Sequence, residues 1–333
     1  MSTVLEPDEW VPRARAHTAR VDVWVQPHLQ RRRTGEKHPV EDFLFDYYHL
    51  SPAKLRRWHP GAGVVLGGPE ATAYLELTDY RQVSGGVTAA RDRLARHGRR
   101  LHDVRRLLVA TASRPASYGC FGLHEWAMVY RQPADQVRHA GQRLRLGSAG
   151  TDTVVEAGPL RCTHIDAYRF FTPEAQPLNA LLPTRDTQVE LEQPGCLHAG
   201  MDLYKWAAAF DPFLPSDLTA DCFAHAREIR AVDMRASPYD LADLGYPPIP
   251  VETPDGRADY VRRQRAFADS GALLRHRLVT ALDTLLGLLP PTPGVAPPDP
   301  QIPGDHAHLA SGPGDGDGRP PAGDRPSGAS GAL

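Results

Sequence analysis

The stretch QPGCLHAGMDLYKWA, Gln193 to Ala207, is the most informative segment of the chain. Small and apolar residues recur in it with helical spacing, and a helix is expected from Cys196 to Phe210. Three or four residues make one turn of a helix, so His198, Asp202 and Lys205 share one side of it. An imidazole, a carboxylate and an ammonium on one face indicate either a pocket that performs chemistry or a core helix whose polar side chains are held by its neighbours.

The composition is that of an ordinary globular protein with an uneven charge distribution. The 333 residues carry a formal net charge of -2, but residues 1–150 carry +8 and residues 151–333 carry -10. Nearly all the cations are arginines, which can pair with phosphate through two hydrogen bonds, so the basic half could hold an anionic ligand. No apolar run reaches the length of a membrane span, and the four cysteines are widely spaced. We therefore expect a cytoplasmic protein with no membrane partner.

Helical periodicity dominates the first 289 residues, and the expected fold is mainly α: a single helical domain over residues 10–289 with a small β element. The expected helices cover Ala16–Arg33 (disturbed at Pro27), the aromatic segment 38–52, Val87–Thr111, 134–142, Cys196–Phe210, Ser216–Arg235 and 255–289 (broken near Gly271). The β candidates are residues 74–77, Arg143–Leu146 and Thr153–Glu156, while Leu160–Phe171 is ambiguous. Residues 290–333 are rich in proline and glycine and poor in large apolar side chains, so this tail is predicted to be disordered.

Histidine and carboxylate residues recur beside aromatic residues at four places. The pairs are His38/Glu41, His124/Glu125, His164/Asp166 and His198/Asp202. Each pair is more often a histidine hydrogen-bonded to a nearby carboxylate than a functional site, but the recurrence raises the odds that one of them is functional. Two histidines and one carboxylate can hold iron or zinc. The candidate ligands are His124, His164, Asp166, His198 and Asp202. On this interpretation the protein is a metal-dependent oxygenase or hydrolase that acts on a small molecule.

Arginines and aromatics also lie together in KLRRWHPG, residues 54–61. Here Arg56 and Arg57 could contact phosphates while a neighbouring aromatic side chain stacks on a base. A run of charges is more often a solvated face, and the acidic second half of the chain argues against a broad DNA-coating surface. Familiar phosphate-loop, dinucleotide-binding and serine-hydrolase motifs are absent from the sequence.

Five segments carry a family resemblance that extends over residues 10–270. They are HPVEDFLFDYYHLSPAKLRRWHPG, FGLHEWAMVYR, RCTHIDAYRFF, EQPGCLHAGMDLYKWA and EIRAVDMRASPYDL. In these segments the chain resembles a mainly actinobacterial family named 3-methyladenine DNA glycosylase. The resemblance implies a DNA-repair hydrolase that releases 3-methyladenine from alkylated DNA without a cofactor. The helix–hairpin–helix signature of one group of such glycosylases is not found in this sequence.

Glycosylase chemistry needs an aromatic pocket for the extruded base and a carboxylate that stabilises an oxocarbenium-like sugar. If the resemblance holds, Asp202 is the leading carboxylate, Glu125 is the second, and His198 orients the attacking water. The expected base pocket and phosphate contacts are Trp126, Tyr204, Trp206, Arg56 and Arg57. A glycosylase and a metal-dependent enzyme both stay open, as does a non-catalytic binding protein. Convergence of three or more candidate ligands would favour the metal, and a lone carboxylate in an aromatic cleft beside the arginine-rich face of residues 91–106 would favour the glycosylase.

Overall fold

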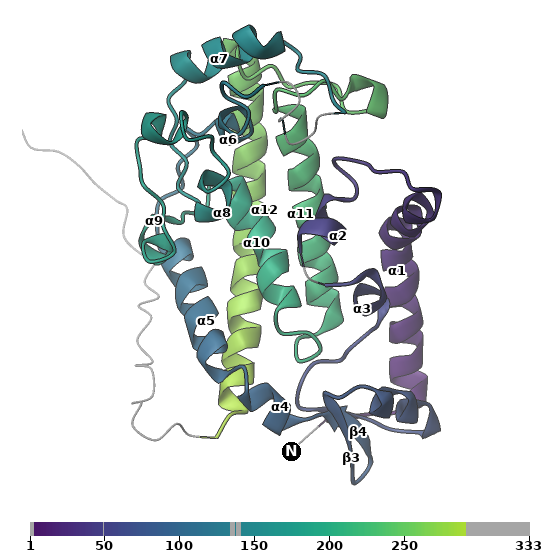
Figure 1. Cartoon of the computed structure of the whole chain (residues 1–333). Helices are drawn as coiled ribbons and strands as arrows, with labels where there is room; N and C mark the ends of the chain where they lie inside the picture. Colours follow the sequence, from purple (N-terminus) through teal and green to yellow (C-terminus); the bar gives the residue numbers. More distant parts are fainter. Residues whose placement is uncertain (1–2, 49, 134–136, 138–140, 291–333) are drawn as a thin grey trace, which may run out of the picture. The chain divides into compact units, whose positions relative to one another are not determined.

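Three helices, α10, α11 and α12, pack against one another, and α10 carries His198, Asp202 and Lys205 (Figure 1). They span Leu197–Ala208, Ser216–Arg235 and Pro254–Gly287. The computed structural model describes residues 3–48, 50–133, 137 and 141–290. Over these residues the fold is mainly helical with a small sheet, as expected. The expected helices at 196–210 and 216–235 are confirmed.

Two glycines let the central helices approach closely. A Cβ atom on Gly200 of α10 would lie 2.7 Å from Ile229 of α11, and one on Gly271 of α12 would lie 3.2 Å from the Nε2 atom of His225. Gly271 was predicted to break the last helix, but α12 runs through it without interruption, so that prediction is wrong. Its role is to leave room for a side chain of the neighbouring helix.

The remaining helices surround this group. The α-helices are α1 (Pro7–Thr34), α2 (Phe43–Tyr47), α3 (Pro52–Arg56), α4 (Arg91–Ala95), α5 (Gly98–Ala112), α6 (Leu123–Ala127), α7 (Gly147–Ala157), α8 (Ile165–Tyr168) and α9 (Gln188–Leu191). The 3-10 helices are η1 (Pro69–Glu76), η2 (Gln176–Leu178) and η3 (Ala242–Leu244). Helix α5 packs against α12, while α1 contacts α3 and α11.

The β element is a four-stranded sheet with the strand order β1-β2-β4-β3. Its strands are β1 (Thr3–Leu5), β2 (Val64–Leu66), β3 (Tyr80–Val83) and β4 (Gly86–Ala89). Strand β1 pairs parallel to β2, and the other two pairings are antiparallel. None of the expected β candidates lies in this sheet. Residues 74–76 belong to η1, Thr153–Glu156 lies within α7, and Arg143–Leu146 contributes an isolated bridge between Leu144 and Tyr239.

The expected helix Val87–Thr111 is divided into three elements. Val87 and Ala89 alternate into the core as part of β4, and the helical part is split between α4 and α5 at His97. The apolar spacing nevertheless continues across the split, because Arg96 keeps a helical backbone conformation. Leu94 and Leu101 are therefore both buried, as a single helix would have placed them. Sequence periodicity alone does not reveal such a turn.

Two expectations near the N-terminus also need correction. Helix α1 begins earlier than expected, behind a capping box between Glu6 and Glu9, and it runs through Pro27 without a break. The aromatic segment 38–52 is helical only at α2, and Pro52 opens α3 behind a Ser51 cap rather than ending a helix.

Two further predictions fall outside the described residues. The tail predicted for residues 290–333 lies beyond the described chain except for residue 290, and most of the helix expected at 134–142 is likewise outside it. Among the helices that are described, none combines the length and the apolar character needed to cross a bilayer.

Candidate functional site

The polar face of α10 carries a buried carboxylate, Asp202, which is held by an ammonium group and a hydroxyl group. Asp202 is 2% exposed, and its carboxylate accepts hydrogen bonds from Lys205 Nζ at 2.8 Å and from Tyr48 Oη at 3.2 Å. Lys205 Nζ also donates to Asp166 on α8 at 2.6 Å. Burial would raise the pKa of Asp202, but Lys205 and His164 outweigh it and hold the pKa well below its usual range. Asp202 is therefore an ionised carboxylate inside the core.

The predicted partner of Asp202 was His198, but the structure pairs Asp202 with other groups. His164 Nε2 lies 3.5 Å from Asp202 Oδ2 and 3.3 Å from Glu192 Oε2. In the described part of the chain no ion pair joins His198 to Asp202. His164 precedes α8, and its Nδ1 atom accepts a hydrogen bond from the Asp166 amide at 3.2 Å, which fixes the orientation of the ring. Burial lowers the pKa of His164, but Glu192 and Asp202 outweigh it and raise the pKa, which favours a proton on the Nε2 atom that faces them and leaves Nδ1 as the acceptor.

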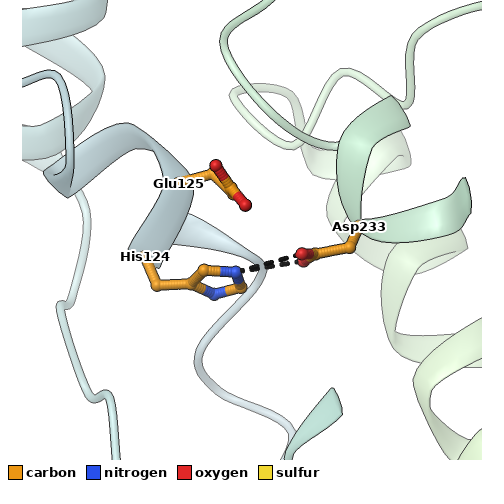
Figure 2. A group of neighbouring side chains, drawn as sticks. All are labelled: His124, Glu125 and Asp233. Atoms are coloured by element: carbon orange, nitrogen blue, oxygen red, sulfur yellow. Dashed lines mark hydrogen bonds and ion pairs between the residues drawn. The ribbon is translucent and has the colours of Figure 1, made fainter. Parts of the chain in front are cut away.

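A second buried group joins α6 to α11, and its three side chains are drawn in Figure 2. The Nε2 atom of His124 lies 3.1 Å from Asp233 Oδ1 and 3.3 Å from Oδ2. Glu125, next to His124 on α6, accepts a hydrogen bond from Arg230 of α11 at 2.7 Å. Arg230 contacts Asp233 only at 3.5 Å. Asp233 Oδ1 is buried and has no hydrogen bond of normal geometry among the described residues.

His198 lies between these two groups. Its ring centroid is 4.5 Å from that of His124 and 5.5 Å from that of His164. Burial and the neighbouring His124 lower the pKa of His198 well below its usual range, so its imidazole is neutral. A neutral imidazole can accept a proton or bind a metal.

A small cavity adjoins this row of histidines. It is lined in part by His124 and His198, and its volume is about 20 Å³. This is room for about one water molecule. The cavity is also lined by Cys120, Cys162 and Cys196, and burial raises the pKa of each of these thiols.

A larger cleft of about 750 Å³ lies beside the first group, with Asp166, Lys205 and Tyr48 in its lining. The lining also includes Trp206 and Tyr47, and Lys205 Nζ lies 4.5 Å from the centre of the Trp206 ring. The small cavity therefore borders the group that contains His124, and the large cleft borders the group that contains Asp166.

Four of the five candidate metal ligands belong to one or other of the two groups, and the fifth, His198, lies between them. His164, Asp166 and Asp202 form one group whose ligand atoms lie within 4.8 Å of one another, and His124 forms the other with Glu125 and Asp233. Asp233 and Glu192 were not among the sequence candidates. Both come from segments distant in sequence from the histidines that they contact. Neither has a histidine one to four residues away, so the His/carboxylate pattern does not include them.

The residues expected to bind a damaged base do not gather in one place. Trp126 is buried and donates its indole N–H to the Ala236 carbonyl oxygen at 2.8 Å, and Tyr204 packs in the core against Phe223. Trp206 does line the large cleft. A stacking role for Trp126 or Tyr204 would require the core to open.

The expected phosphate contacts lie elsewhere. Arg56 pairs with Asp22 at 2.6 Å, and Arg57 is exposed just after α3. The arginine-rich face of residues 91–106 contributes Arg100 to the large cleft, whereas Arg105 pairs with Asp283.

Comparison with known proteins adds no relative: no protein-family model, curated protein or solved structure matches this chain.

The buried pairing of Lys205 generates a prediction about stability. Replacing Lys205 by Met leaves Asp202 ionised and poorly compensated in the core, which costs about 3–5 kcal/mol in similar cases. Lys37 is exposed, and Lys37→Met removes the same charge from the surface. We expect urea unfolding to show a loss of at least ~3 kcal/mol for Lys205→Met and less than ~1 kcal/mol for Lys37→Met. Equal stability of the two variants would contradict the pairing described here.

Proposed function

We propose that the protein is a metal-dependent enzyme whose metal is bound by His124, Glu125 and Asp233, with His198 as the neighbouring imidazole. The proposal rests on the convergence of these three ligand atoms within 4.8 Å inside the protein. Imidazole and carboxylate ligands together suit iron, manganese or zinc. In an octahedral or tetrahedral site with bonds of about 2.1 Å, adjacent ligand atoms are about 3.0–3.4 Å apart. The 3.1 Å and 3.3 Å separations between His124 and Asp233 fit that range.

The contacts of Asp233 support this group over the other one, because Asp233 Oδ1 lies 3.1 Å from His124 Nε2 yet makes no hydrogen bond of normal geometry among the described residues. Arg230 neutralises Glu125, but it leaves Asp233 Oδ1 buried without a hydrogen bond of normal geometry among the described residues. Burying a carboxylate oxygen without a partner is costly, and a bound cation would remove that cost. In the other group Lys205 already donates to both Asp166 and Asp202, and His164 uses Nδ1 as an acceptor. Since a metal-bound histidine usually donates its second ring N–H, we expect one metal per chain, at His124.

The chemistry of such a site follows from its surroundings. When bound, the metal would supply Lewis acidity or a site for oxygen activation, and zinc would favour hydrolysis while iron would favour oxygenation. The adjoining cavity has room for about one water molecule beside His124 and His198. Asp233 and Glu125 would hold the metal, and neutral His198 could act as a ligand or accept a proton.

Elemental analysis of freshly purified, untagged protein tests this proposal. We expect near one equivalent of iron, zinc or manganese per chain, and we expect Asp233→Asn and His124→Ala to lose most of it. Asp202→Asn is the matched control because Asp202 belongs to the group that Lys205 fills, so it should keep the metal. Metal-free wild-type protein, or equal loss in Asp202→Asn, would contradict the proposal.

A second candidate function is release of 3-methyladenine from alkylated DNA, which the family resemblance implies and one feature of the large cleft favours. Asp211 lines this cleft, and burial raises its pKa to about 6, opposed in part by Lys54 and Arg57. Asp202, beneath the lining residues Tyr48 and Lys205, stays ionised. A carboxyl group that is protonated below about pH 6, together with an ionised carboxylate, is an arrangement found in enzymes that cleave glycosidic bonds. Trp206 in the same cleft offers a surface for stacking a base.

A base-release assay on alkylated duplex DNA tests this candidate. If Asp211 is the general acid, it is protonated below pH 6, so the rate should fall as the pH rises above about 6. Asp211→Asn should lower the rate by about 10²-fold or more, whereas exposed Asp243→Asn should leave it unchanged. The absence of any base release by the wild-type protein between pH 5 and 8 would exclude this function.

A further inference from the structure

We propose that the large cleft binds a small molecule bearing a phosphate or carboxylate group, held by Arg169, Arg185 and Lys205. Lys205 belongs both to this site and to the buried group of Asp166 and Asp202. The site includes none of the proposed metal ligands. A volume of about 750 Å³ is within the range of small-molecule binding sites. Since the cleft lining contains none of the proposed metal ligands, the inference does not depend on the proposed metal.

An excess of positive charge surrounds one carboxylate of the cleft. Asp166 is contacted by Arg169 Nε at 3.3 Å, by Lys205 Nζ at 2.6 Å and by Arg185, so three cations converge on a single anion. Lys205 also neutralises the buried Asp202. Three cations therefore face two carboxylates, which leaves a net positive charge at the cleft. The whole lining has five cationic side chains against three carboxyl groups. They are Lys54, Arg100, Arg169, Arg185 and Lys205 against Asp79, Asp166 and Asp211.

Arg169 and Arg185 both retain N–H donors that a bound anion could use. Arg169 uses Nε for Asp166 and Nη2 for Tyr47. Arg185 uses Nη1 and Nη2 for Asp166, and Nη1 also for Gln188. A guanidinium group has five N–H donors, so each arginine retains some that are not committed to these contacts. Their side chains are 47% and 55% exposed, which leaves those donors accessible. Asp166 thus holds the arginines in place as a fixed anion-binding pair.

Aromatic side chains in the cleft indicate what the ligand carries besides its anionic group. Tyr47 and Trp206 line the same cleft as the cations, and the Trp206 ring already contacts the Lys205 ammonium. Aromatic side chains beside an anion site favour a ligand that also carries a flat or apolar part. We commit to a small ligand because the cleft volume suits one, and because Arg56 and Arg105 outside the cleft are engaged by Asp22 and Asp283.

Titration calorimetry with phenyl phosphate tests the inference on the full chain after metal depletion, so that the result is independent of the metal group. We expect saturable binding by the wild-type protein. The double variant Arg169→Gln/Arg185→Gln should weaken it at least tenfold. The matched control is Arg143→Gln/Arg262→Gln, which removes the same charge from side chains 83% and 69% exposed and outside the cleft lining. It should change the affinity less than twofold.

Several results would overturn the inference. These are no binding of phenyl phosphate at millimolar concentration, equal weakening by both double variants, or equal affinity for the neutral benzyl alcohol. Displacement of phenyl phosphate by a 12-nucleotide single strand at lower concentration would also overturn it, because the occupant would then be a nucleic acid. Thermal unfolding of each variant separates these results from misfolding. Metal content measured on the undepleted protein reports separately on the proposed function.

Discussion

The need to neutralise buried carboxylates is the constraint on which the arrangement of the core helices depends. Asp202 on α10 and Asp166 on α8 are both buried and share the ammonium of Lys205, while Glu125 on α6 pairs with Arg230 on α11. Removing such charges from water costs several kcal/mol per ion, so each must be met by a cation from another segment. These ion pairs therefore fix how α6, α8, α10 and α11 sit against one another. Gly200 and Gly271 allow the close helix contacts that go with this arrangement.

The charge balance also distinguishes the two buried groups. At Asp166 and Asp202 a lysine occupies the position that a metal would take, and the same lysine reaches the edge of the large cleft. At His124, Arg230 satisfies Glu125 and leaves one oxygen of Asp233 without a good partner. The first group therefore presents positive charge to a cleft, whereas in the second group Asp233 is contacted by His124 at 3.1 Å and by Arg230 at the longer distance of 3.5 Å. The proposed metal site and the proposed anion site follow from this difference.

The sequence predicted the fold class and the central helices because their periodicity is long and regular. It failed at short elements, since the strand β4 and the turn at His97 continue an apolar spacing that reads as one helix. At the site, the sequence identified His124, His164 and His198 as histidines of interest, and the structure brings them together. It could not identify the partners, because His124 pairs with Asp233 and His164 with Glu192, from segments far away in the chain. Neighbouring carboxylates in sequence were the only partners that spacing could suggest.

The most direct test of the account is the location of a bound metal. Crystals of the protein loaded with zinc or iron should give an anomalous-diffraction peak at the absorption edge of that metal. The account predicts one peak within coordination distance of His124, Glu125 and Asp233, with Arg230 moved away from Asp233. A peak between Asp166 and Asp202 that displaces Lys205, or the absence of a peak at both groups, would contradict it.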